Sequence, residues 1–202
     1  MKTGIGPVIQ LATFIQQDDE CMTGNAFFSG EIQVEPIGIV KNNIGQPPLV
    51  AKEDGLHRND AGGSAMEAMR GSHEQQSEIL LAPHLAELLE GIDAYSHIVV
   101  LYWGHAVPPH GRKLAKTHPA GLEKYPKQGI FATCSPARPN PVLMKVVRLL
   151  RRDGTHLVVE GLDAIDQSPV LDIKPYVADM YPQEDVRIPQ WMADIQKEFG
   201  RR

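Results

Sequence analysis

The sequence has little cysteine, no long apolar run and no excess of positive charge. Cys21 and Cys134 are the only two cysteines among 202 residues. Because they stand in unlike surroundings, a polar N-terminal segment and a proline-rich loop, we expect no disulfide. No apolar run approaches the length of a membrane-spanning helix, and residues 1–17 contain only Lys2 before a short apolar stretch. We therefore expect a cytoplasmic protein without a membrane segment.

The overall charge argues against a general affinity for nucleic acid. The formal net charge is -5 and the isoelectric point is about 5.9, whereas most nucleic-acid-binding domains are basic. Any RNA partner would have to be met by a local patch. Hydrophobic residues make up 42% and charged residues 22%, which is typical of a folded globular chain, and the length fits one domain with a real core.

Several short segments predict β-strands. Residues 37–40, 77–81 and 96–103 are rich in apolar and β-branched residues, and the continuous apolarity of the last predicts burial on both faces. Two further apolar runs flank Asp153-Gly154, which predicts a hairpin with a type I′ turn.

Helices are expected to be short and peripheral. Pro83 begins a segment with leucines at helical spacing that Gly91 would close. Near the C-terminus, Trp191, Ile195 and Phe199 would share one face of an amphipathic helix.

Two loops carry the remaining signals. Residues 42–71 are rich in glycine, proline, asparagine and aspartate and are expected to be loop. The simplest interpretation of His57, Arg58 and His73 is that they are solvated loop residues. Residues 106–128 form a second loop, with five cations and only Glu123 to offset them, and are the best local match to phosphates.

The most informative stretch runs from residue 129 to residue 176. Pro136, Pro139 and Pro141 predict a rigid, extended loop before the hairpin, and a rigid polar loop beside packed strands is a good place for a site.

Several motifs in this stretch, in order, resemble one known family. They are Phe131-Ala132-Thr133-x-Ser135-Pro136-x-Arg138-Pro139-Asn140-Pro141, Asp163-x-x-Asp166-x-x-Pro169 and Val170-Leu171-Asp172-Ile173-Lys174-Pro175-Tyr176, preceded by Tyr95-Ser96-His97-Ile98 and His105. The family is the TsaA-like (YaeB or TrmO) family, whose members use S-adenosylmethionine to N-methylate threonylcarbamoyladenosine beside the tRNA anticodon.

The resemblance implies a mainly β fold, a single compact antiparallel β-barrel with short peripheral helices, acting as a homodimer. It divides the chain into an N-terminal extension (1–30), the barrel domain (31–180) and a C-terminal helical tail (181–202). The apolar face of the predicted C-terminal helix also favours a dimer. The implied cofactor is S-adenosylmethionine, the implied partner is tRNA, and no metal is expected.

The resemblance also implies the site residues, and no catalytic residue among them is assigned. The residues expected to hold the donor are His105, Cys134, Ser135, Arg138, Asn140, Lys145, Asp163, Asp166 and Ser168. The candidates for tRNA contact, Arg112, Lys113 and Lys116, follow instead from the local charge of the 106–128 loop, to which Arg148, Arg151 and Arg152 add further cations. Each polar residue also has a structural alternative: the two aspartates could cap a turn and Asn140 could satisfy backbone groups. His97 is expected to be a buried structural histidine.

Three departures from the family pattern keep other functions open. Cys134 stands where the family has arginine, which exchanges a charged, multidentate donor for a small thiol. Gln167-Ser168 stands where the family reads Gly-Thr, and the family's Arg-Gln-x-Gly motif is absent. The alternatives are a methyltransferase of a small metabolite and a non-catalytic binding module on the same barrel.

Overall fold

The computed structural model describes residues 32–59 and 74–199. The chain divides into two units, Met1–Pro36 and Ile37–Arg202, and every strand and helix of the described residues lies in the second. The expected N-terminal extension and His73 fall outside the described residues. The strands are β1 (Gly38–Lys41), β2 (Leu49–Lys52), β3 (Gly55–Arg58), β4 (Gln76–Leu81), β5 (His97–Trp103), β6 (Lys116–Thr117), β7 (Gln128–Gly129), β8 (Val142–Asp153), β9 (His156–Glu160) and β10 (Pro169–Pro175).

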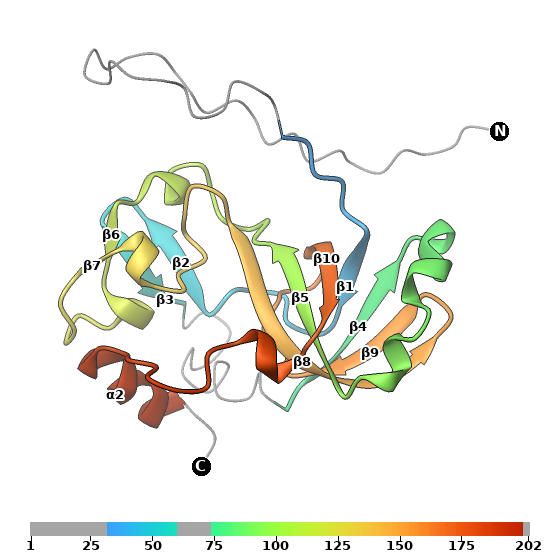
Figure 1. The fold of residues 1–202 in the computed structure, drawn as a ribbon. Coiled ribbons are helices and arrows are strands. Elements are labelled where there is room, and N and C mark those ends of the chain that lie inside the picture. The colour runs from blue at the N-terminus through green and yellow to red at the C-terminus, as the bar shows by residue number, and fades with distance from the viewer. Residues whose placement is uncertain (1–31, 60–73, 200–202) are drawn as a thin grey trace, which may run out of the picture. The chain divides into compact units, whose positions relative to one another are not determined.

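Six of these strands close an antiparallel barrel in the order β1-β10-β5-β8-β9-β4 (Figure 1). The fold class expected from the sequence is therefore confirmed. The barrel interior is filled by aliphatic side chains, among which Val40, Ile79, Ile98, Leu157 and Val170 have no exposed surface. Closure removes free sheet edges except where the strands are staggered.

Strands β5 and β8 have the burial patterns that their sequences predict. In β5, Ile98, Val99 and Val100 are at most 2% exposed, so the prediction of burial on both faces is confirmed. In β8, exposed and covered residues alternate over the first half of the strand, as expected where one face meets the core and the other meets solvent.

The β8–β9 hairpin is confirmed, but its predicted turn type is wrong. The register pairs Asp153 with His156, so the two central residues are Gly154 and Thr155 rather than Asp153 and Gly154. Of these, only Gly154 has a positive φ, 59°. Glycine with positive φ at the first central position is the pattern of a II′ turn, which suits hairpin twist as well as a I′ turn does.

The expectation of loop throughout residues 42–71 is wrong for its described half. Strands β2 and β3 form a hairpin there, with Leu49 paired to Arg58 and Lys52 to Gly55. A contact with a distant part of the chain stabilises the hairpin, because Leu56 is buried and its N–H donates to the Thr117 hydroxyl at 2.9 Å. Four-residue strands show too little periodicity to be read from sequence.

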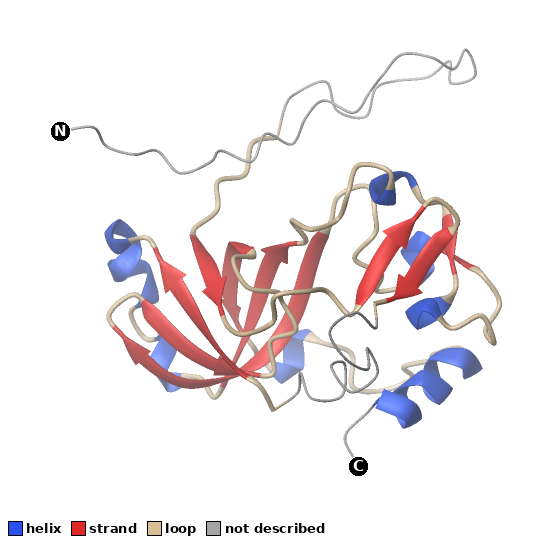
Figure 2. Ribbon diagram, turned by 180° about the vertical axis from the view of Figure 1, so that it is seen from behind, coloured by secondary structure: helices blue, strands red, loops and turns tan. Residues whose placement is uncertain are grey.

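The small sheets gather on one side of the barrel. Figures 1 and 2 show β2–β3 and β6–β7 together there, with the C-terminal helix α2 (Gln190–Phe199) on the same side. The predicted basic loop 106–128 therefore contains strand β6 and the first residue of β7. Glu198 of α2 pairs with Lys124 and accepts from the Tyr125 hydroxyl at 3.4 Å, so this helix contacts its own chain.

The remaining helices are short 3₁₀ segments. They are η1 (Pro83–Leu89), η2 (Ile92–Ala94), η3 (Gly111–Lys113), η4 (Pro119–Gly121), η5 (Ile130–Ala132) and η6 (Ala178–Met180). The predicted helix at Pro83 exists in this tighter form, and Gly91 follows it with a φ of 82°. Within the described ranges, no helix is long and apolar enough to cross a membrane.

The expected homodimer stays a prediction. Trp191 and Ile195 of α2 are half-buried within the chain, so this helix face is a weaker argument for a dimer than the sequence suggested. Uncovered apolar side chains lie instead on the outer face of β8, where Met144 is 59% exposed.

Candidate functional site

The strand ends bring the motif residues together. The end of β5 pairs with the starts of β8 and β10, through Trp103 with Val142 and Tyr102 with Val170. The first two residues of β1 pair with the start of β10, and the next residue, Val40, donates its N–H to the Ser168 carbonyl. The loops 104–105, 133–141 and 161–168 therefore all leave or enter the barrel at the same end. We call this end the barrel mouth.

Strand β8 projects beyond its neighbour at the mouth. Its first half pairs with β5, whereas β9 begins to pair with it only at Arg148, opposite Glu160. The overhang of six residues, Val142–Val147, measures about 20 Å at the usual rise per residue. Across this overhang the loop 161–168 returns from β9 to β10, starting at Gly161, whose φ is 92°.

Asn42 fixes that loop to the barrel. Its amide Nδ2 donates to the Ser77 hydroxyl at 3.0 Å and to the Ala164 carbonyl at 2.9 Å. Its backbone N–H donates to Asp166 Oδ1 at 3.1 Å. Hydrogen bonds from the Gln167 side chain and from this backbone N–H hold the pKa of Asp166 below its usual value, so the carboxylate is charged at neutral pH.

Asp163 is the centre of a second polar network. Its Oδ1 accepts from the Tyr102 hydroxyl at 2.8 Å, and its Oδ2 accepts from Lys145 Nζ at 2.9 Å. Tyr102 is only 5% exposed, and burial together with the Asp163 charge raises the pKa of this phenol strongly. The hydroxyl therefore keeps its proton and holds one side of the carboxylate in place.

His105 lies where β5 ends. Its Nδ1 is 3.4 Å from the hydroxyl of Ser168, a side chain that is 1% exposed. Partial desolvation lowers the pKa of the ring, and the Asp166 charge offsets this only in part. The imidazole is consequently neutral at neutral pH, with one nitrogen able to take up a proton.

The proline-rich loop separates its polar residues into two groups. Ser135 is buried and accepts from the Ala137 N–H at 3.1 Å. Arg138 donates to the Ser135 and Thr133 carbonyls at 2.8 and 2.6 Å, so both residues stiffen the loop itself. Cys134 and Asn140 are exposed, and within the described ranges the Asn140 amide makes no hydrogen bond.

A cleft of about 510 Å³ opens where β9 separates from β8. It is lined by Ser96, His97, Lys145, Val146, Arg148, Glu160 and Gly161. The prediction that His97 is buried is wrong: it starts β5 with its ring exposed, beside Tyr176. The cleft reaches the Asp163 network through Lys145.

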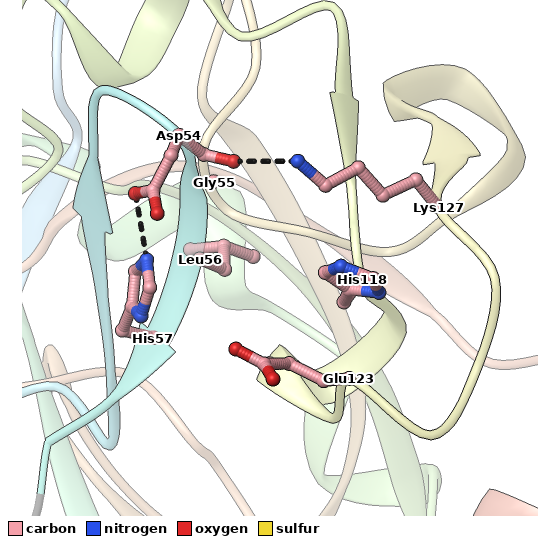
Figure 3. Close-up of a pocket in the computed structure, with 8 residues that line it drawn as sticks. Asp54, Gly55, Leu56, His57, His118, Glu123 and Lys127 are labelled. Carbon is pink, nitrogen blue, oxygen red and sulfur yellow. Dashed lines mark hydrogen bonds and ion pairs between the residues drawn. The ribbon is translucent and has the colours of Figure 1, made fainter.

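A smaller cavity of about 140 Å³ lies apart, in the β2–β3 region (Figure 3). Its wall includes His57, which hydrogen-bonds Asp54 at 2.7 Å, and Lys127, which donates to the Asp54 carbonyl at 3.1 Å. His57 is thus a cavity residue on a strand, not a solvated loop residue. Across the described residues, no group of three or more candidate ligands is placed to hold a metal ion.

The basic candidates differ in what their side chains already contact. The Arg112 guanidinium lies over the Trp103 ring, 5.3 Å from its centroid, whereas Lys113 and Lys116 are exposed. Arg152 donates to the Leu89 carbonyl at 2.9 Å and pairs with Asp93. Arg112 and Arg152 are therefore partly occupied by packing.

Sequence reasoning missed Asn42 and Tyr102. Asn42 is the first residue after β1, and Tyr102 is the one hydroxyl in an apolar strand. A polar group directly after or inside a buried strand needs a partner, and that requirement was the available signal.

Comparison with known proteins places the chain among methyl-donor-binding proteins. Residues 66–181 match the tRNA-methyltransferase O N-terminal domain family. The chain is 37% identical over 150 residues to a probable S-adenosyl-L-methionine-binding protein of Methanothermobacter thermautotrophicus, across 74% of this chain and 93% of that protein. It is 31% identical over 151 residues to the tRNA (adenine(37)-N6)-methyltransferase of Escherichia coli, across 72% of this chain and 57% of the enzyme.

Solved structures agree with these matches. The crystal structure of TrmO from Pseudomonas aeruginosa superposes with a TM-score of 0.55 at 26% identity, over 80% of this chain and 62% of that one. This chain therefore spans less than two thirds of the solved structure.

Proposed function

This chain belongs to the tRNA-methyltransferase O family of S-adenosylmethionine-dependent methyltransferases, and we propose that it methylates N6 of adenosine 37 in tRNA, with threonylcarbamoyladenosine as the acceptor. The observation that carries the proposal is the gathering of the three motif loops at the barrel mouth, which the strand register requires. Family membership supports the reaction class, and the E. coli relative's name supports the position in tRNA.

The residues at the mouth fit the proposed donor. S-adenosylmethionine supplies an electrophilic methyl group on a sulfonium, together with an ammonium, a carboxylate and an adenosine. Asp163 and Asp166 offer ionised acceptors for hydroxyl and ammonium groups. The Asn140 amide, which makes no hydrogen bond within the described ranges, offers both a donor and an acceptor for an adenine edge.

The loop residues Ser135 and Arg138 act indirectly in this proposal. Their hydrogen bonds run to their own loop, so they position Asn140 and would not contact the donor. Cys134 is exposed beside them and leaves room where the family has a longer, charged side chain. Ser168 likewise acts by contacting His105.

His105 is the residue that we propose takes the acceptor's proton. N6 of the acceptor lies between an aromatic ring and a carbonyl, so its lone pair is delocalised and its proton must leave as the methyl group is gained. The neutral ring of His105 has a nitrogen for that proton. In the tautomer that carries its proton on Nδ1, which lies 3.4 Å from the Ser168 hydroxyl, Nε2 is the acceptor atom.

The experiment is methylation of defined tRNA by the purified protein. We expect nuclease digests to contain methylated threonylcarbamoyladenosine when tRNA that carries the modification is incubated with S-adenosylmethionine, and no methylated product from tRNA that lacks it. Donor binding without methylation of either tRNA would point to a small-metabolite substrate. Absence of donor binding in calorimetry would point to a non-catalytic module.

A further inference from the structure

We propose that Gln167 is a positioning residue of the proposed donor site: its side-chain amide fixes the Asp166 carboxylate for S-adenosylmethionine, while its own backbone is strained. The inference rests on the proposed function and adds to it a residue that sets the geometry of one donor contact.

The backbone of Gln167 adopts a conformation that suits glycine. Its φ is 64°, in the left-handed region, which only glycine enters without a steric cost. Among the described residues, the other non-glycine residues with positive φ are Ala120 and Asp185. The family pattern reads glycine at the position of Gln167, so a residue that removes the strain is compatible with this turn. The strain therefore calls for a compensating role of the side chain.

The turn itself does not need the glutamine side chain. Backbone hydrogen bonds form it, because the Gln167 N–H donates to the Val40 carbonyl at 2.8 Å and the Asp166 N–H donates to the Ile44 carbonyl at 2.8 Å. Glycine at position 167 would keep both bonds. The Gln167 side chain is exposed, so it does not fill the core either. What it contributes is a contact with Asp166.

The Gln167 amide completes a pair of donors that hold the Asp166 carboxylate. Gln167 Nε2 donates to Asp166 Oδ2 at 3.1 Å, and the Asn42 backbone N–H donates to Oδ1 at 3.1 Å. With one donor on each oxygen, the carboxylate cannot rotate without losing a hydrogen bond. Each oxygen keeps a lone pair for a ligand, and 31% of the Asp166 side chain is exposed.

The charged groups near Asp166 do not replace this contact. Lys41 Nζ lies 3.9 Å from Oδ2, too far for a hydrogen bond, and the Lys41 side chain is 47% exposed, so its charge is screened by solvent. His105 interacts with the carboxylate electrostatically but is neutral at neutral pH. The hydrogen bond from Gln167 is also the main cause of the lowered pKa of Asp166. The directional restraint on Oδ2 therefore comes from Gln167.

The test compares two variants at this position. Gln167→Gly removes both the strain and the amide, whereas Gln167→Ala keeps the strained backbone and removes only the amide. We expect both to raise the donor Kd, measured by calorimetry, by about 3- to 10-fold, as for a lost hydrogen bond to a charged group.

The midpoint of chemical denaturation separates positioning from a structural role. For Gln167→Gly it should lie at or above the wild-type midpoint, because relief of the strain offsets the greater freedom of glycine in the unfolded chain. Donor affinity then falls without a loss of stability, which a purely structural role would not produce.

Asp185→Gly is the matched control. Asp185 is also an exposed residue in the left-handed region, with a φ of 57°, but it lies after β10 and outside the mouth loops. Its replacement relieves the same kind of strain and should leave the donor Kd unchanged.

Two results would overturn the inference while leaving the proposed function intact. A donor Kd that is unchanged in both Gln167 variants would mean that donor binding does not depend on this restraint of Asp166. A Kd raised only in Gln167→Gly would mean that the stiffness of the backbone matters and the amide does not. Wild-type protein that binds no S-adenosylmethionine is a different result, which overturns the proposed function and the positioning role together.

Discussion

At the scale of single residues, the proposed site contains two side chains whose pKa values are shifted in opposite directions and which are both neutral at neutral pH. Tyr102 keeps its proton, because burial and the Asp163 charge raise its pKa. His105 stays neutral, because desolvation lowers its pKa. A phenol that cannot ionise positions Asp163, and an imidazole that is free of charge can accept a proton.

The lowered pKa of His105 gives a pH dependence. Since the ring is neutral above its pKa and protonated below it, activity should be constant at neutral pH and fall as pH drops through a value below the usual histidine pKa of about 6.5. We expect His105→Asn to lower kcat by about 10²- to 10⁴-fold, the range for a lost general base, and to remove this acid limb.

The measurement is kcat against pH for both proteins, with donor Kd as the control. His84, an exposed histidine with no described hydrogen bond, provides the matched variant His84→Asn. An acid limb that persists unchanged in His105→Asn would assign it to another group.

At the scale of elements, β1 and β4 approach so closely that one position accepts only glycine. A Cβ at Gly38 would lie 2.3 Å from the Leu80 carbonyl oxygen and 2.9 Å from the Leu81 Cα. Both are backbone atoms that no side-chain rotation can move. We expect Gly38→Ala to lower the free energy of unfolding by about 1–3 kcal/mol, the usual cost of overpacking.

Chemical denaturation measures this cost, and Gly129→Ala is the control. Gly129 has no atom near its Cβ position and no positive φ, so its substitution should be nearly neutral. Equal stability of the two variants would mean that β1 and β4 can move apart without loss.

Elements with a strong pattern could be predicted from sequence, and isolated side chains could not. Strand β5 is continuously apolar and strand β8 alternates between exposed and covered residues. Both patterns can be recognised from the local sequence alone. The β2–β3 hairpin is stabilised by Thr117, a residue far along the chain, so no local signal marks it. Asp163 was found because it lies in a motif, whereas its partner Tyr102 lies in an apolar strand whose pattern reports only burial.

At the scale of the whole molecule, the proposed function requires an acidic protein to bind an acidic partner. The formal net charge is -5, so attraction to tRNA depends on local cations such as Lys113 and Lys116 in the ordered loop and Arg148 in the cleft. Arg112 contributes less, because its guanidinium lies over Trp103.

Binding of tRNA should consequently weaken steeply with salt. Each neutralised phosphate of a single strand adds about 0.7 to the slope of log Kd against log salt, so the double variant Lys113→Ala/Lys116→Ala should bind more weakly and with a shallower slope. Donor affinity should be unaffected. Lys174→Ala is the control, since Lys174 is paired with Asp172 at 2.6 Å. A double variant with the wild-type slope would remove this loop from the tRNA interface.

The closure of the barrel also determines when, during synthesis and folding, the proposed site can form. Strand β1 pairs with β10, and Asn42 holds Asp166 across 124 residues of sequence. Contacts of such high sequence separation form slowly, because the entropy of closing a long loop must be overcome first. On the ribosome, β1 emerges long before β10 exists, so the nascent chain must wait with its first strand lacking one neighbour. The proposed donor site is therefore among the last parts to assemble, and a prematurely terminated chain that lacks β10 contains the proline-rich loop without the barrel mouth.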